Sequence, residues 1–177
     1  MLDIGTSPSS TTLQIADVID GGAGTDTMSV TLATATSTIP AATIKNVEIF
    51  NIRNVASTVG ENFANITGET KIVSAGSQAA LVLTGVGSGT TLGVSDTAQN
   101  LTATYAANAF AAGSTLNLDL SNAGTNVSGT ITRSIIDAGQ ATAAGAATGV
   151  SIAATGANYV TLAASGANDI AAAAGIK

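Results

Sequence analysis

The residues with the most specific chemistry lie in a short Gly-Asp segment near the start of the chain. Residues 21–29, GGAGTDTMS, match the nonapeptide G-G-x-G-x-D-x-U-x with Met28 as the apolar U, and residues 17–19 have the form of the tail of a preceding copy. Glycines reach backbone angles that turn carbonyl oxygens inward, and carboxylates supply the oxygen ligands that calcium prefers. The candidate calcium ligands are therefore Asp17, Asp20 and Asp26 by side chain, and Gly22 and Gly24 by carbonyl.

The same segment has a second interpretation that needs no metal. A calcium site in such repeats forms between adjacent turns, whereas this chain contains about one and a half copies. A Gly-rich tight turn in which Asp20 and Asp26 accept hydrogen bonds from local amides would use the same residues. If calcium binds, it stabilises the folded chain by mass action, so EGTA or Asp26→Ala would lower the melting temperature.

Composition excludes several other kinds of site. The 177 residues include no His and no Cys, which excludes disulfides, imidazole or thiolate metal ligands, and Ser/His or Cys/His nucleophiles. Lys and Arg number 5 against 11 Asp and Glu, so the net charge of −6 gives no basic surface for a nucleic acid.

A few charged residues lie close enough in sequence to suggest cleavage of a polysaccharide. These are Arg133 with Asp137, and Glu61 with Glu69 and Lys71. A sugar-processing site also needs aromatic platforms, and the chain has only 3 Phe, 2 Tyr and no Trp. We therefore expect these charges to lie on the solvated surface and the protein not to be an enzyme.

Short runs of alternating or β-branched residues, separated by Gly, Asn, Ser or Asp, predict an all-β protein. Between residues 70 and 105 the apolar centres fall near Ile72, Val82, Leu92 and Leu101, nine or ten residues apart. Two such units make one coil of a parallel β-solenoid, or alternatively a hairpin of a β-sandwich. Small side chains and few aromatics favour the narrow core of a solenoid. The predicted strands are 27–32, 44–52, 71–74, 81–84, 91–95, 101–105, 115–120, 127–136, 150–153 and 159–163.

The domain organisation is expected to be simple, with an N-terminal arm at residues 1–16 and one elongated all-β domain at 17–177. The Ala-rich stretches 106–113 and 138–147 could instead form short helices, since Ala is the best helix former. No apolar run of about 18 residues predicts a membrane span. Residues 1–10 lack a basic residue followed by an apolar run, so no cleavable signal peptide is expected.

Two segments resemble those of bacterial surface-layer and RTX-like (repeats-in-toxin) surface proteins. Residues 17–32 resemble the calcium turn of that family, and residues 43–52, TIKNVEIFNI, resemble the segment that follows it. The Thr/Ala/Gly-rich runs at 80–86, 100–105 and 116–120 resemble its coils, so the likeness covers most of residues 14–170. The resemblance implies a calcium-stabilised β-solenoid that assembles on a bacterial exterior after type I secretion. Family members commonly carry many nonapeptides, whereas this chain has one clear copy.

The last predicted strands suggest self-assembly. Residues 150–153 and 159–163 are uncharged, so an exposed sheet edge formed there would have no Lys or Pro to block pairing with another chain. Three Asn residues also fit the N-x-[ST] glycosylation pattern, although a chain this rich in Thr gives such matches by chance. They are Asn65, Asn100 and Asn126.

Together these observations predict a non-enzymatic structural subunit of a bacterial cell-surface layer or extracellular filament. The expected partner is a second copy of the chain, with cell-surface polysaccharide as a further candidate, and no nucleic acid or membrane span is expected. Two alternatives remain open at this point. One is an extracellular adhesin domain that binds glycans or protein, and the other is a β-helix enzyme that degrades polysaccharide.

Overall fold

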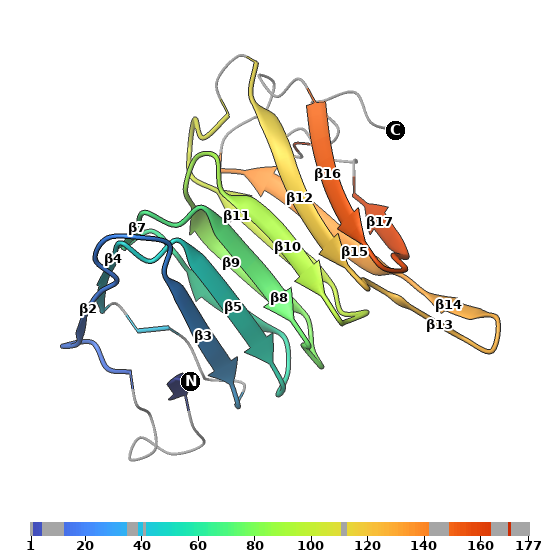
Figure 1. Cartoon of the computed structure of the whole chain (residues 1–177), viewed down its shortest axis with the longest axis horizontal. Coiled ribbons are helices and arrows are strands. Elements are labelled where there is room, and N and C mark those ends of the chain that lie inside the picture. Colours follow the sequence, from blue (N-terminus) through green and yellow to red (C-terminus); the bar gives the residue numbers. More distant parts are fainter. Residues whose placement is uncertain are drawn as a thin grey trace.

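The computed structural model describes residues 2–4, 13–34, 39–40, 42–110, 113–141, 149–163 and 170. The described chain is nearly all β, and its parallel sheets stack as a β-solenoid (Figure 1). The prediction of a parallel β-solenoid is therefore confirmed, and the β-sandwich alternative is wrong. Among the described residues, no helix has the length and apolar character needed to cross a membrane.

The largest sheet, sheet A, has seven parallel strands, and six of them lie side by side across the view of Figure 1. Its two edge strands, β1 and β16, belong to opposite ends of the stack. The segment predicted as an N-terminal arm thus contributes a strand, because β1 pairs with β3. In spatial order the strands are β1 Leu2–Ile4, β3 Thr27–Leu32, β5 Ile49–Asn54, β8 Lys71–Ala75, β10 Thr91–Ser95, β12 Thr115–Ser121 and β16 Gly149–Thr155.

Two further parallel sheets complete the coils. Sheet B has three strands, β2 Val18–Asp20, β4 Thr43–Lys45 and β7 Ile66–Thr67. Sheet C has five strands, and β6 and β17 are its edges. In chain order the strands of sheet C are β6 Val59–Asn62, β9 Leu81–Val86, β11 Leu101–Tyr105, β15 Ser134–Gln140 and β17 Val160–Leu162.

The register between neighbouring strands shows how many residues one coil contains. Ile72 lies opposite Leu92 in sheet A, and Leu81 lies opposite Leu101 in sheet C, each 20 residues later along the chain. The predicted spacing of apolar centres is therefore confirmed as half a coil. Because parallel in-register neighbours face the same side of a sheet, every inward position becomes a column of stacked side chains. One such column contains Met28, Phe50, Ile72, Leu92 and Leu118, all of which are buried.

Small polar residues form the corners between the sheets. At the end of sheet A, left-handed backbone angles recur at stacked positions, with φ of 59° at Gly76, 52° at Asp96, 50° at Asn122 and 70° at Gly156. Only Gly, Asn and Asp adopt such angles readily, which explains the repeated Gly, Asn and Asp between strands.

The structure corrects several predicted boundaries. Residues 44–52 form parts of β4 and β5 with a corner between them, and residues 127–136 include a turn. The strands β1, β2, β6 and β7 have no counterpart among the predicted strands. Neither Ala-rich stretch forms a helix where it is described, since Ala106–Phe110 is a turn region and Ala138–Gln140 belongs to β15. Residues 111–112 and 142–147 of these stretches lie outside the described residues.

Candidate functional site

The Gly-Asp segment forms the corner between β2 and β3, at the N-terminal end of the stack. Gly21 donates its amide hydrogen to the Lys45 carbonyl of the next coil at 3.1 Å. A Cβ atom at residue 21 would lie 1.8 Å from the Asn46 carbonyl oxygen, so only glycine fits this close approach. Gly22 and Gly24 have φ of 86° and 126°, with open space around them. The glycine pattern therefore has a structural reason in the packing and turning of the chain.

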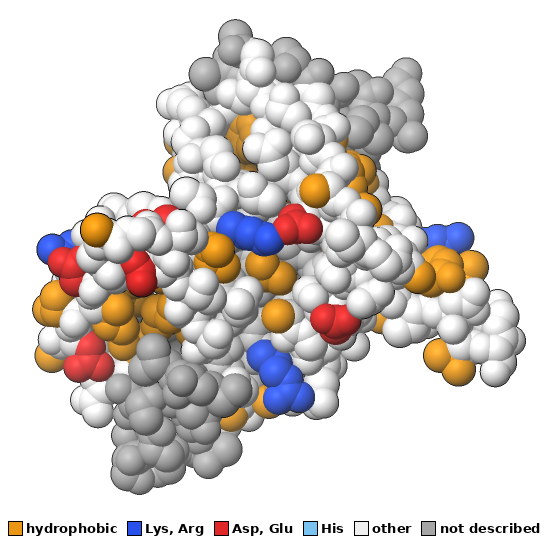
Figure 2. Space-filling view, viewed as in Figure 1, with side chains coloured by type: hydrophobic (Ala, Val, Ile, Leu, Met, Phe, Trp, Pro, Cys, Tyr) orange, Lys and Arg blue, Asp and Glu red, His pale blue; other side chains and the backbone are white. Residues whose placement is uncertain are grey.

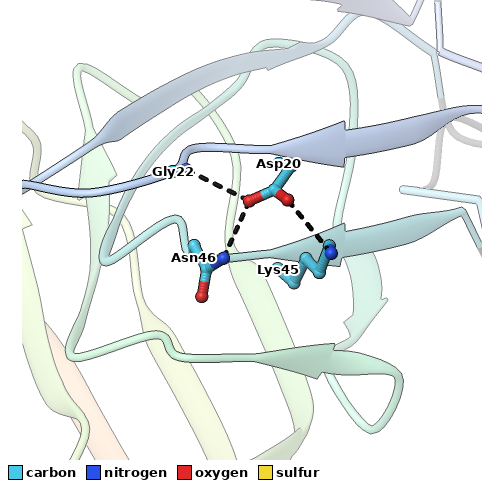
Figure 3. Close-up of polar contacts among 4 residues, drawn as sticks. All are labelled: Asp20, Gly22, Lys45 and Asn46. Atoms are coloured by element: carbon cyan, nitrogen blue, oxygen red, sulfur yellow. Dashed lines mark hydrogen bonds and ion pairs between the residues drawn. The ribbon is translucent and has the colours of Figure 1, made fainter.

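The Asp20 carboxylate is held by three groups of the chain (Figure 3). Its Oδ1 accepts hydrogen bonds from the Asn46 side-chain amide at 2.7 Å and from the Gly22 amide at 3.1 Å. Its Oδ2 lies 3.0 Å from the Lys45 ammonium. The Asn46 hydrogen bond, followed by the one from Lys45, lowers the pKa of Asp20 below its usual range. A protein ammonium group thus sits where the sequence suggested a metal cation.

The other two aspartates have separate surroundings. Asp17 accepts a hydrogen bond from the Gln14 amide at 2.8 Å. Asp26 donates its own amide hydrogen to Glu48 Oε2 at 2.8 Å, while its buried Oδ2 has no hydrogen-bond partner in the described part of the chain. The described residues contain no group of three or more Asp or Glu side chains placed to hold a metal ion. Asp17, Asp20 and Asp26 form no such group, and calcium binding stays a prediction.

Carboxylates at this corner link neighbouring coils through backbone amides. Glu48 reaches back to the Asp26 amide of the preceding coil, and Glu69 Oε1 accepts a hydrogen bond from the Gly87 amide of the following coil at 3.0 Å. Burial raises the pKa of Glu69 against the opposing effect of its amide hydrogen bonds. Hydrogen bonds from amides to carboxylates are stronger than those between neutral groups, so these acids stabilise the stack.

The charged residues considered for polysaccharide cleavage do not form one site. Arg133 and Asp137 are exposed, as expected. The expectation of surface charge is wrong for Glu61, which is fully buried in the core because it occupies an inward position on β6. Lys71 instead forms an ion pair with Asp119 on the outer face of sheet A.

The ion pair of Lys71 and Asp119 crosses β10, where the residue opposite Asp119 is a glycine without a side chain. Lys71 lies on β8 and Asp119 on β12, and Gly93 of β10 lies opposite both Val73 and Asp119. A Cβ atom at residue 93 would be 2.8 Å from a Val73 methyl carbon. Because Gly93 has no side chain, nothing projects from the outer face of sheet A at this position. A groove of about 300 Å³ lies on this face beside Lys71 and Asp119. Charged side chains on this view of the molecule are few and scattered (Figure 2).

The three candidate glycosylation residues lie on the surface in different settings. Asn65 is exposed in the turn before β7. The Asn100 Oδ1 accepts a hydrogen bond from the Ile135 amide at 3.0 Å. Asn126 lies on β13, where its Oδ1 accepts from the Gly129 amide at 3.1 Å. All three residues are exposed, and glycosylation of each stays a prediction.

The C-terminal end of the stack presents an open strand edge. Within the described part of the chain, β16 pairs with β12 alone, and β17 is likewise the edge strand of sheet C. Ile152 lies opposite Leu118, so its side chain belongs to an inward column. Yet Ile152 is 55% exposed, whereas Leu118 is 2% exposed. The apolar column thus continues to the last coil and ends uncovered there.

A hairpin projects from the coil before this edge. β13 Thr125–Val127 and β14 Thr130–Thr132 pair antiparallel, and all their residues are exposed. Ser128 and Gly129 form its turn with φ of 52° and 86°. Figure 1 shows the hairpin extending away from the stacked sheets. Sequence reasoning missed it, although the Ser-Gly pair was the available signal.

Comparison of the chain with protein-family models, with curated proteins and with solved structures finds no match. Inference about function therefore rests on the fold and on the contacts described above.

Proposed function

We propose that this chain is a non-enzymatic structural subunit that assembles head to tail with copies of itself on the outside of a bacterial cell. The observation that carries the proposal is the edge of β16, a seven-residue strand that pairs only with β12 among the residues that the structure describes. An unpaired strand edge presents amide and carbonyl groups that another strand can bind. Uncovered Ile152 adds apolar surface at the same place.

The direction of the strands makes repeated addition possible. β16 and β1 are opposite edges of one parallel sheet, so β16 of one copy can pair with β1 of the next copy without a change of strand direction. An interface between two different surfaces of identical subunits leaves a free surface at each end. Assembly of this kind therefore gives a filament, or strips from which a surface layer is built.

The use of the acidic residues supports a structural rather than a catalytic function. Asp20, Glu48 and Glu69 accept hydrogen bonds that connect coils, and Asp119 pairs with Lys71. The location outside a bacterial cell and the relation to RTX-like surface proteins are proposed from the resemblance, of which residues 17–52 are the most specific part.

The alternative of an adhesin has one observation in its favour. The projecting hairpin exposes Val127 by 67% and Ile131 by 42%, and an exposed apolar ribbon suits contact with a protein or a glycan. An adhesin would remain monomeric and would bind a ligand on a glycan or protein array.

The test compares two variants on the same strand by negative-stain electron microscopy and light scattering. Ile152→Lys places a charge in the uncovered inward column of β16, and the control Ile152→Val keeps an apolar side chain at the same position. We expect the wild type and Ile152→Val to form filaments or strips, and Ile152→Lys to remain monomeric. A wild type that is monomeric at all concentrations would contradict the proposal and favour the adhesin.

A further inference from the structure

A carboxyl group lies inside the apolar core of the solenoid, at the N-terminal edge of sheet C. On β6 the side chains of Val59 and Glu61 face inward, whereas Gly60 and Asn62 are exposed. Glu61 lies opposite Leu83, which begins a run of buried apolar residues at the same position on the following strands. An acid thus occupies the first place of an otherwise apolar column.

The carboxyl connects β6 to the preceding coil. Its Oε2 accepts a hydrogen bond from the Ile39 amide at 2.5 Å, across 22 residues of sequence. Ile39 and Ala42 are themselves buried in the core, and with Pro40 they form what we call the Ile39 segment. β6 pairs with β9 on its other side, so this contact lies where a further strand of sheet C would be. Among the described contacts, the Glu61 carboxyl thus connects the Ile39 segment to the N-terminal edge of sheet C.

The second carboxyl oxygen is left without a partner. Glu61 Oε1 is buried and has no hydrogen-bond partner in the described part of the chain. Burial raises the pKa of Glu61 to about 7, and the Ile39 amide opposes this only partly. No charged or titratable side chain of the described residues contributes: β9 presents Leu81 and Leu83, and the covering segment presents Ile39 and Ala42. An ionised carboxylate in this place gains solvation when the segment moves away.

We propose that Glu61 is a pH-dependent latch, which holds the Ile39 segment against the edge of sheet C when its carboxyl is protonated and favours release of the segment when it is ionised. Release lets water reach the carboxylate, whose pKa then returns toward its ordinary value of 4.5. The opening equilibrium must therefore rise with pH between these two values and level off above the higher one. The inference is independent of self-assembly, because the latch lies within one chain.

Amide hydrogen exchange at Ile39, measured by NMR between pH 4.5 and 8 and corrected for the intrinsic rate, tests the latch. We expect protection of this amide to fall on the order of a hundredfold across that range in the wild type. Glu61→Gln keeps an acceptor for the amide and should remove the pH dependence. Glu69→Gln is the matched control, since it removes another partly buried carboxyl that caps an amide, and it should behave as the wild type at Ile39.

Carbon-13 NMR of the Glu61 carboxyl in the wild type gives a second measurement that needs no variant. Its midpoint should coincide with the pH above which protection of the Ile39 amide stops falling, at about 7. A carboxyl that titrates near 4.5, or the same pH dependence of protection in Glu61→Gln, would overturn the proposal.

Discussion

Asn54 offers the sharpest test of how the coils are held together at the corner between sheets A and C. Its side chain is fully buried at the end of β5, where Nδ2 donates to the Ser57 carbonyl at 2.5 Å and to the Ala80 carbonyl at 2.8 Å. Its Oδ1 accepts a weaker hydrogen bond from the Ala56 amide at 3.3 Å. The side-chain amide of Asn54 thus donates one hydrogen bond within its own corner and another to the corner of the next coil.

The variant Asn54→Ala removes both donors and leaves two carbonyl groups short of a partner. The Ala80 carbonyl keeps a long bond of 3.4 Å from the Val59 amide. With about 1 kcal/mol for each of the two hydrogen bonds that Nδ2 donates, and a further 1 kcal/mol or more for the Ser57 carbonyl left without this partner, the expected loss of unfolding free energy is ~3 kcal/mol. At a urea m-value of about 2 kcal/mol/M the unfolding midpoint falls by about 1.5 M.

Urea unfolding followed by far-UV circular dichroism measures this loss at a concentration where the chain is monomeric. The matched control is Asn62→Ala, since Asn62 is exposed and its Oδ1 accepts one hydrogen bond, from the Ala64 amide at 2.9 Å. We expect the control to lose no more than about 1 kcal/mol. Equal losses in the two variants would refute the reasoning, because burial and the second coil would then contribute nothing.

Two further predictions concern the acidic residues. Since burial raises the pKa of Glu61 from 4.5 to about 7, the folded chain binds the proton more tightly than the unfolded chain, and stability falls as pH rises between these values by ~3 kcal/mol. The stability of Glu61→Gln, measured by thermal unfolding, should not fall with pH in this way. If it falls as in the wild type, other titratable groups cause the pH dependence. Because Lys45 and Asn46 hold Asp20, we expect EGTA to leave the melting temperature unchanged. A fall with EGTA that Asp26→Ala reproduces would instead support bound calcium.

The coils that follow a regular pattern could be predicted from the sequence. Thr27–Leu32, Thr91–Ser95 and Leu101–Tyr105 have the predicted boundaries, because alternating apolar residues define them. β6 was missed for a physical reason, since Glu61 takes the inward position that an apolar residue occupies in the other coils. The hydrophobic pattern therefore fails at the same residue that gives this end of the core its titratable group.

The Gly-Asp segment shows the limit of reasoning from a motif. The same glycines that would expose carbonyls to a metal also allow a close approach between coils, as Gly21 does against Asn46. The sequence does not reveal which residues of the next coil will lie opposite Asp20, because that depends on register. Here the neighbours are Lys45 and Asn46, which supply a cation and an amide from the chain itself.

The register of sheet C has a consequence for the use of this fold as a scaffold. Leu81 faces Leu101 after 20 residues, whereas Leu101 faces Ile136 after 35, yet both pairs are in register. Much of the added length leaves the stack as the hairpin, so the strands on either side keep their positions. Chain length can therefore change here without cost to the core. A foreign peptide inserted between Val127 and Thr130 would be displayed at a fixed height along the stack, and in a filament at regular intervals.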